Sequence, residues 1–192
     1  AQRGEITKVW GLTAAERATF WFDIPYAKEA IASMEFVLQD NSTPASEIYR
    51  AQLTVPDQPG IISVRLPSSM PPLRAGELYQ WFFKVRLNCD AKPAANQPAV
   101  KQQISKEELY GWVQRISPSP TLAEQLQQAT PQQRATVYIE NGIWYDALTT
   151  LAELRLTNLQ SSAPTEDWQN LLKAVGLEGL ATKPLTVCCS PQ

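Results

Sequence analysis

Apolar and polar residues alternate along most of the first half of the chain. This pattern is typical of β-strands that bury one face, because successive side chains of a strand point to opposite sides. Proline, glycine or a polar turn follows most of the alternating stretches. We therefore expect strands at residues 19–26, 32–39, 49–55, 62–66, 79–89 and 110–116.

The same alternation predicts which side chains form a core. A turn at residues 57–60, with the sequence Asp-Gln-Pro-Gly, predicts a β-hairpin between strands 49–55 and 62–66. The inward-facing residues of the first two strands are expected to be Phe20, Phe22, Ile24, Met34, Phe36 and Leu38.

No helix-length amphipathic segment separates these strands, which favours an antiparallel sandwich over a parallel sheet. The order Leu73, Gly76, Tyr79 and Trp81 is similar to the turn before the penultimate strand of immunoglobulin-like and fibronectin-like domains. In that turn the tyrosine hydroxyl anchors the corner. We expect an α+β protein in which an N-terminal antiparallel immunoglobulin-like β-sandwich packs against a C-terminal helical unit.

Helix signals replace the strand pattern after residues 117–120, Ser-Pro-Ser-Pro. Thr121 with Glu124, and Thr130 with Gln133, have the spacing of capping boxes. The order Tyr138, Gly142, Trp144, Ala147 and Leu151 resembles one tetratricopeptide-like helical hairpin. A single hairpin leaves one face open, so we expect the sandwich, the helix around 168–175 or a partner to cover it.

These patterns divide the chain in two. The sandwich is expected to cover residues 1–117, with a leader at 1–13 and a mobile insertion at about 90–105 that is rich in Pro, Ala, Asn and Gln. The helical unit is expected at 118–192, with a tail that returns to the sandwich.

Composition excludes several classes of function. The 192 residues carry a formal charge of −2 without a basic stripe, so nucleic acid is not an expected partner. The apolar runs are shorter than a membrane span requires. Histidine is absent, which removes the usual catalytic triad and most zinc chemistry. We expect no enzymatic activity, no metal and no cofactor.

Three cysteines bear on the compartment. A disulfide between Cys89 and either Cys188 or Cys189 would fasten the tail to the sandwich, whereas three reduced thiols would fit a cytosolic protein. The chain starts Ala1-Gln2, as it would after removal of a signal peptide or in a trimmed chain. We expect a periplasmic or extracellular protein.

Large aromatic side chains and one acid are the candidate binding residues. Trp10 lies outside the core pattern and Trp112 follows a glycine, so both are expected to be exposed. Asp146 follows Trp144 and Tyr145, and such large apolar neighbours would raise the pKa of its carboxyl group. The alternatives are core packing of the aromatic residues, and an Asp146 that faces solvent or pairs with Arg134 or Arg155.

Four blocks, TFWFDIPY, PGIISVRLP, YGWVQRI and ENGIWYDALTTLAELR, together resemble a cyanobacterial family known as domain of unknown function 928. The resemblance covers about residues 19–154. It implies a cyanobacterial source, an exported protein and a fold, but no activity. It also implies that Cys188 and Cys189 pair with Cys89, with each other or with another chain.

The leading hypothesis is a non-enzymatic exported interaction or structural protein. Such a protein would dock on a larger cell-envelope or extracellular assembly, or self-associate. The alternative is a carbohydrate-binding module that uses exposed aromatic residues on one sheet, with polysaccharide as the partner. A third hypothesis is a hydrolase in which Asp146 and a second acid line a cleft.

Overall fold

A computed structural model describes residues 9–89, 103–157 and 163–186 of the chain. The strands are β1 (Val9–Thr13), β2 (Thr19–Ile24), β3 (Ile31–Asp40), β4 (Glu47–Leu53), β5 (Gly60–Arg65), β6 (Leu78–Cys89), β7 (Gln103–Arg115) and β8 (Leu185–Thr186). The helices are α1 (Pro120–Gln128), α2 (Pro131–Glu140), α3 (Trp144–Thr157) and α4 (Ala163–Ala174), with short 3₁₀ turns at Lys28–Ala30 and Glu178–Leu180. None of the described helices is long and apolar enough to cross a membrane.

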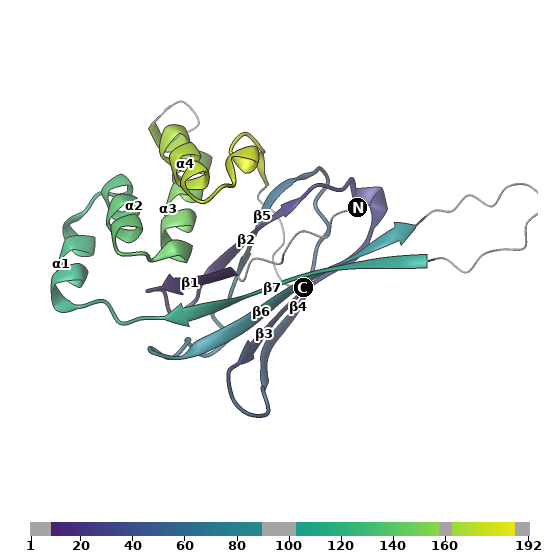
Figure 1. Cartoon of the computed structure of the whole chain (residues 1–192), viewed down its shortest axis with the longest axis horizontal. Coiled ribbons are helices and arrows are strands. Elements are labelled where there is room, and N and C mark those ends of the chain that lie inside the picture. The colour runs from purple at the N-terminus through teal and green to yellow at the C-terminus, as the bar shows by residue number, and fades with distance from the viewer. Residues whose placement is uncertain (1–8, 90–102, 158–162, 187–192) are drawn as a thin grey trace, which may run out of the picture.

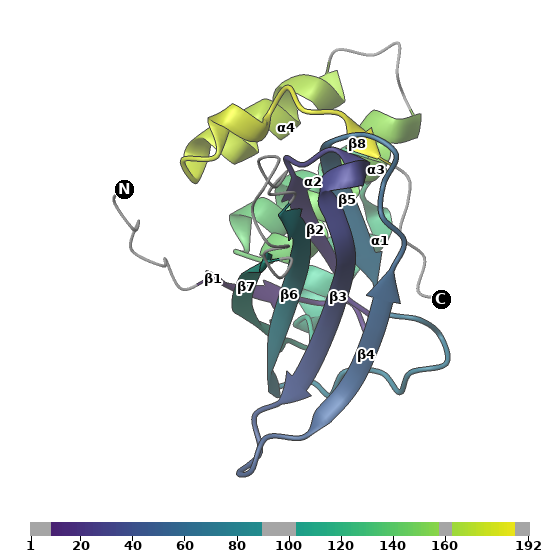
Figure 2. The same ribbon diagram turned by 90° about the vertical axis from the view of Figure 1, so that its right-hand side faces the viewer.

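Two sheets form the β-rich part. The large sheet has the order β1-β7-β6-β3-β4, and the small sheet has the order β2-β5-β8. Figure 1 shows the helices gathered on the side of the small sheet, and Figure 2 shows β7, β6, β3 and β4 side by side. The α+β class is confirmed. The immunoglobulin-like topology remains a prediction.

The expectation of purely antiparallel sheets is wrong. β1 runs parallel to β7, and β8 runs parallel to β5. Both exceptions come from segments remote in sequence, one before the first predicted strand and one after the last helix. Alternation within a segment carries no information about a strand partner so distant along the chain, because it reports only which face is buried.

The predicted core residues lie between the two sheets. Phe22 of β2 and Phe83 of β6 stack with their ring centroids 4.1 Å apart. Phe20 and Phe36 approach to 4.9 Å across the same layer. The six residues predicted to face inward are all buried: Phe20, Phe22, Ile24, Met34, Phe36 and Leu38.

The predicted hairpin between residues 49–55 and 62–66 is also wrong. β4 pairs with β3, whereas β5 pairs with β2 and β8 in the other sheet. Ile61 and Ile62 are both buried, Ile62 against the large sheet and Ile61 against the helices. The small sheet, which contains β5, therefore lies between the large sheet and the helices. Because β4 and β5 belong to different sheets, the chain crosses from one sheet to the other at residues 54–59.

The predicted tyrosine corner is present. The backbone N–H of Arg74 donates a hydrogen bond of 2.8 Å to the Tyr79 hydroxyl. Gly76 has φ of +82°, a left-handed conformation that glycine adopts without the strain of a side chain. The sequence therefore identified this turn correctly.

The helical unit is fastened to the rest of the molecule by α3. α2 and α3 pack together and join through Gly142, whose φ is +67°. α3 also packs on α4, β1 and β2, which covers the face that a lone hairpin would leave open. The likeness to a tetratricopeptide unit remains a prediction.

Only one of the two predicted capping boxes exists. The Thr130 side chain accepts from the Gln133 backbone while the Gln133 side chain accepts from the Thr130 backbone. α1 is capped by Ser119, which accepts from Leu122, and not by Thr121. Pro120 at the first position of α1 shifts the start of the helix, since proline fits where no N–H is needed.

The segments expected to be irregular contain strand residues. The leader at 1–13 includes β1, which forms an edge of the large sheet. The expected insertion at about 90–105 overlaps β7 at residues 103–105, and its remainder lies outside the described residues. The tail does return to the sheets, as β8.

Candidate functional site

An aromatic row crosses the outer face of the large sheet, the face turned away from the small sheet. Trp10 of β1 and Trp112 of β7 are register partners, and Tyr110 of β7 is the partner of Phe82 in β6. Register partners share a face of a sheet. We call Trp10, Trp112, Tyr110 and Phe82 the aromatic row.

Three rings of the aromatic row, those of Phe82, Tyr110 and Trp112, contact each other in sequence but are not coplanar. The centroids of Tyr110 and Trp112 lie 5.7 Å apart at an interplanar angle of 82°, and those of Phe82 and Tyr110 lie 6.4 Å apart at 35°. Trp10 is 55% exposed, and the other three side chains are half-buried. In the described part of the chain no helix lies on this face (Figure 1).

Polar neighbours divide the outer face into two zones. Beside Trp112 across the sheet lie the amide side chains of Gln80 and its register partner Gln39. Beyond Phe82 the side chains are charged, and those next to it pair among themselves, whereas Arg86 and Lys106, the next register partners on this face, form no ion pair within the described residues. Lys84 lies 3.8 Å from both Glu35 and Glu108, and Arg50 lies 2.7 Å from Glu35.

The core beneath the aromatic row holds β7 in place. A side chain at Gly111 would put its Cβ 2.4 Å from the Trp81 ring and 2.7 Å from the Val9 carbonyl oxygen. The Trp81 indole N–H donates to the Tyr145 hydroxyl at 2.8 Å, and that hydroxyl donates to the Trp112 carbonyl at 3.1 Å. Tyr145 of α3 therefore supports the strand that carries half of the row.

A separate cleft of about 490 Å³ lies between α3 and the sheets. Such a volume falls in the range of small-molecule sites. Asp146 and Glu153 are two acids among its lining residues, together with Thr13, Ala15, Arg17, Thr19, Arg65, Leu66, Ser68, Tyr138, Tyr145, Thr149 and Thr150.

The acids of the cleft already have partners. Asp146 accepts a 3.0 Å hydrogen bond from the backbone N–H of Ala14, and Thr13 also bonds to its carboxylate. These contacts fasten α3 to the connection between β1 and β2. Glu153 pairs with Arg65, which also donates to Thr19. Both acids thus hold the two parts of the molecule together.

The alternative in which Asp146 pairs with Arg134 or Arg155 is wrong. Arg134 donates to the Leu126 carbonyl at 2.9 Å, and the Arg155 guanidinium lies 5.2 Å from the centroid of the Trp168 ring. Asp146 is in the first turn of α3 and faces β1 instead, so its donors come from the β1–β2 connection.

Burial raises the pKa of Asp146, and hydrogen bonds from Thr13, Ala14 and Ala15 partly oppose this rise. A carboxyl whose folded-state pKa is raised stabilises the fold fully below its unfolded pKa, and this contribution is lost as pH rises through the folded pKa.

We therefore expect Asp146→Asn to gain stability relative to the wild type as pH increases above about 4. Urea unfolding of both proteins at several pH values up to neutrality measures the difference. A difference that is constant with pH, or that changes in the opposite direction, would contradict the assigned pKa shift.

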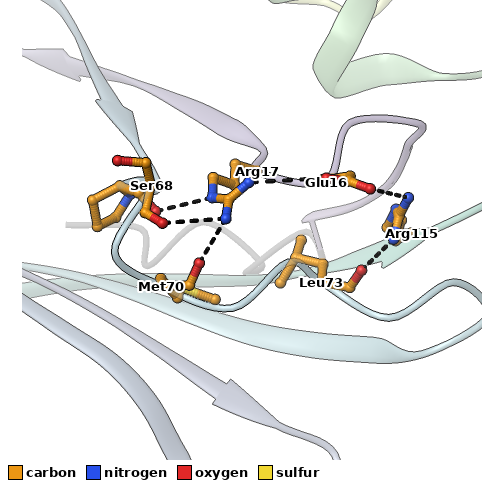
Figure 3. A network of polar contacts seen from close by, with 7 residues as sticks. Glu16, Arg17, Ser68, Met70, Leu73 and Arg115 are labelled. Atoms are coloured by element: carbon orange, nitrogen blue, oxygen red, sulfur yellow. Dashed lines mark hydrogen bonds and ion pairs between the residues drawn. The ribbon is translucent and has the colours of Figure 1, made fainter.

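Two arginines bond to the segment of chain between β5 and β6. Arg17 donates to the carbonyl oxygens of Pro67, Ser68 and Met70 at 3.0–3.2 Å, as Figure 3 shows for this network. Arg115 donates to the Leu73 carbonyl at 2.5 Å. The contacts fasten the β1–β2 connection and β7 to the chain before β6.

The residues singled out from the sequence fall into two groups. Trp10 and Trp112 lie together on the outer face, whereas Trp144, Tyr145 and Asp146 begin α3 on the other side of the large sheet. Tyr110 and Phe82 were not predicted as site residues from the sequence, although the period of two in β7 places Tyr110 on the face of Trp112. The side chain of Cys89, and Cys188 and Cys189, lie outside what the structure describes.

The described residues include no group of three or more histidine, cysteine or acidic side chains placed to hold an ion.

The fold and its exposed face define an α+β protein with two mixed sheets, one helical flank and one open aromatic surface. The chain belongs to the family described as Domain of Unknown Function (DUF928), whose model matches residues 5–185. The resemblance seen in the sequence is thus confirmed for the family.

Comparison with other proteins adds little. A solved structure from a photo-crosslinking study of multimeric cell-adhesive interactions of VGSC beta subunits is 10% identical, with a TM-score of 0.28. The match covers 62% of this chain and 98% of that one, and is too slight to assign a fold. No curated protein matches the chain.

Proposed function

We propose that the protein is a non-enzymatic interaction protein that docks on a cell-envelope or extracellular assembly through the aromatic row. The observation that carries the proposal is the continuity of the row over three neighbouring strands of one open face. Aromatic side chains supply most of the binding energy in many interfaces, since they bury a large area with little loss of conformational freedom.

The energetics of exposure support this assignment. Trp10 is 55% exposed on an edge strand, where a charged residue would protect the sheet better. Burying one large apolar side chain stabilises a complex by about 1.5–3 kcal/mol. Several adjacent aromatic rings on one face are therefore more typical of a surface that a partner covers than of a surface that stays exposed to solvent.

The cleft supports the proposal indirectly. Asp146 and Glu153 each bond to a neighbouring element, which favours a structural role for both over the acid pair of a hydrolase. The proposal extends to an exported protein of cyanobacterial type, in which an oxidising compartment would let Cys89 pair with Cys188 or Cys189.

Retention on isolated cell envelopes tests the proposal. We expect wild-type protein to sediment with envelopes of the source organism. Trp10→Ala combined with Trp112→Ala should lower the retained fraction about tenfold, because two ring contacts are lost. Trp10→Ala alone should lower it less, and its high exposure means that the fold is retained.

The matched control is Leu109→Ala. Leu109 is 54% exposed, but it shares the opposite face of β7 with Gly111. Its loss removes exposed apolar area without touching the aromatic row, so retention should stay at the wild-type value. Equal retention of wild type and the double variant, or equal loss with Leu109→Ala, would refute the proposal.

A further inference from the structure

We infer that the aromatic row binds an uncharged polysaccharide as a single chain. This inference rests on the proposed function and specifies the ligand of the same surface. It follows from three features of the outer face: neighbouring aromatic rings, neutral amides beside them, and a group of charges next to Phe82 that are paired among themselves.

The rings supply the apolar part of the site. Trp10, Trp112, Tyr110 and Phe82 present ring faces and edges over β1, β7 and β6, with contacts of 5.7 and 6.4 Å between successive centroids. A sugar ring has an apolar face of C–H groups and a rim of hydroxyls. Such a ring packs on an aromatic side chain while its hydroxyls stay in water or reach polar neighbours.

The neighbours are suited to hydroxyl groups. Gln80 lies beside Trp112, and Gln39 lies next to Gln80 on the same face. An amide both donates and accepts hydrogen bonds, as a hydroxyl does, so the two match without any net charge. Gln114, beyond Trp112 along β7, donates to the Gly76 carbonyl and fixes the border of this zone.

The charged zone argues against an ionic ligand. Lys84 lies 5.7 Å from the Phe82 ring centroid, and its ammonium lies 3.8 Å from both Glu35 and Glu108. An anionic chain at the row would meet the carboxylates of this network, and a cationic chain would have to displace Lys84. Neither sign of charge finds an unpaired partner in this network, so a neutral chain costs least to desolvate.

The ring angles select a single chain over a crystalline surface. A flat polysaccharide crystal contacts aromatic rings only if they lie in one plane. Tyr110 and Trp112 are inclined by 82°, and Phe82 and Tyr110 by 35°. A single flexible chain can turn successive sugar rings to meet faces of different inclination.

Isothermal titration of the whole protein with defined oligosaccharides tests the inference. The neutral probes are cellohexaose, xylohexaose, mannohexaose and maltohexaose, and the charged probe is hexagalacturonic acid. We expect saturable binding of at least one neutral probe, and binding of the charged probe about tenfold weaker or absent. The protein should not sediment with crystalline cellulose.

Variants place the binding on the row. Trp112→Ala should weaken the neutral probe about tenfold or more, Gln80→Ala several-fold, and Leu109→Ala less than twofold. Circular dichroism confirms that each variant is folded, and Trp10→Ala provides a second test at an exposed position.

The outcomes separate this inference from the proposed function. If no neutral probe binds, or if binding survives Trp10→Ala and Trp112→Ala, the polysaccharide inference is wrong. If envelope retention still depends on Trp10 and Trp112 and is abolished by protease treatment of the envelopes, the partner is a protein and the proposed function stands. If neither oligosaccharide binding nor envelope retention depends on Trp10 and Trp112, both the polysaccharide inference and the proposed function are wrong.

Discussion

Gly111→Ala is expected to destabilise the protein by about 2–3 kcal/mol. The new methyl group would approach the buried Trp81 ring to 2.4 Å and the Val9 carbonyl oxygen to 2.7 Å. Trp81 is locked through the Tyr145 hydroxyl, and Val9 belongs to the strand that pairs with β7. The clash therefore pushes β1, β7 and α3 apart. Urea unfolding measures the loss as a lower midpoint at an unchanged slope.

The control for this substitution is Gly179→Ala. A Cβ at Gly179 meets no heavy atom within 4 Å, and the residue does not have a positive φ. We expect a change within about 0.5 kcal/mol of the wild type. If Gly111→Ala is as mild as Gly179→Ala, the close packing of β7 on Trp81 does not exist in solution.

Trp168→Ala is expected to cost about 3–5 kcal/mol. Trp168 is the largest fully buried side chain of the described residues, at 1% exposure, and joins α4 to α3. The Arg155 guanidinium over its ring adds a cation–π contact that alanine would remove. Thermal and urea unfolding should both report the loss.

Trp10→Ala is the matched control, because the same substitution is made at an exposed position. We expect its stability to change by less than about 0.5 kcal/mol. Because α3 contacts both sheets and α4, Trp168→Ala should lower the midpoint of the single unfolding transition of the whole protein. Separate unfolding of the helices, with the sheets unaffected, would contradict this coupling.

The sequence predicts individual elements of this fold better than their arrangement. Alternation in Phe20, Phe22 and Ile24 reports a buried face, and this is a local property that a short window contains. The placement of β1 beside β7 and of β8 beside β5 depends on contacts between distant segments. The two adjacent isoleucines, Ile61 and Ile62, indicate a strand buried on both faces. The alternating pattern of the same strand instead predicts a single buried face, so the sequence does not decide between the two.

The sequence predicted two of the four residues of the aromatic row. Trp10 stood out because it lies outside the core pattern and Trp112 because it follows Gly111, and both lie on the outer face. Tyr110 and Phe82 were missed, since a half-buried aromatic residue in a strand has the same sequence signature as a core residue. Asp146 drew attention through its neighbours, but the sequence does not show that its carboxylate accepts a hydrogen bond from the backbone N–H of Ala14, on the connection between β1 and β2.

The most direct test of the account is oxidative footprinting of the protein, free and bound to isolated envelopes, read residue by residue by mass spectrometry. We predict that binding protects Trp10, Tyr110, Trp112 and Phe82, while Leu109 on the opposite face of β7 is oxidised equally in both states. Protection confined to the cleft, at Tyr138 and α3, with an unchanged aromatic row, would contradict the claim that this row is the binding surface.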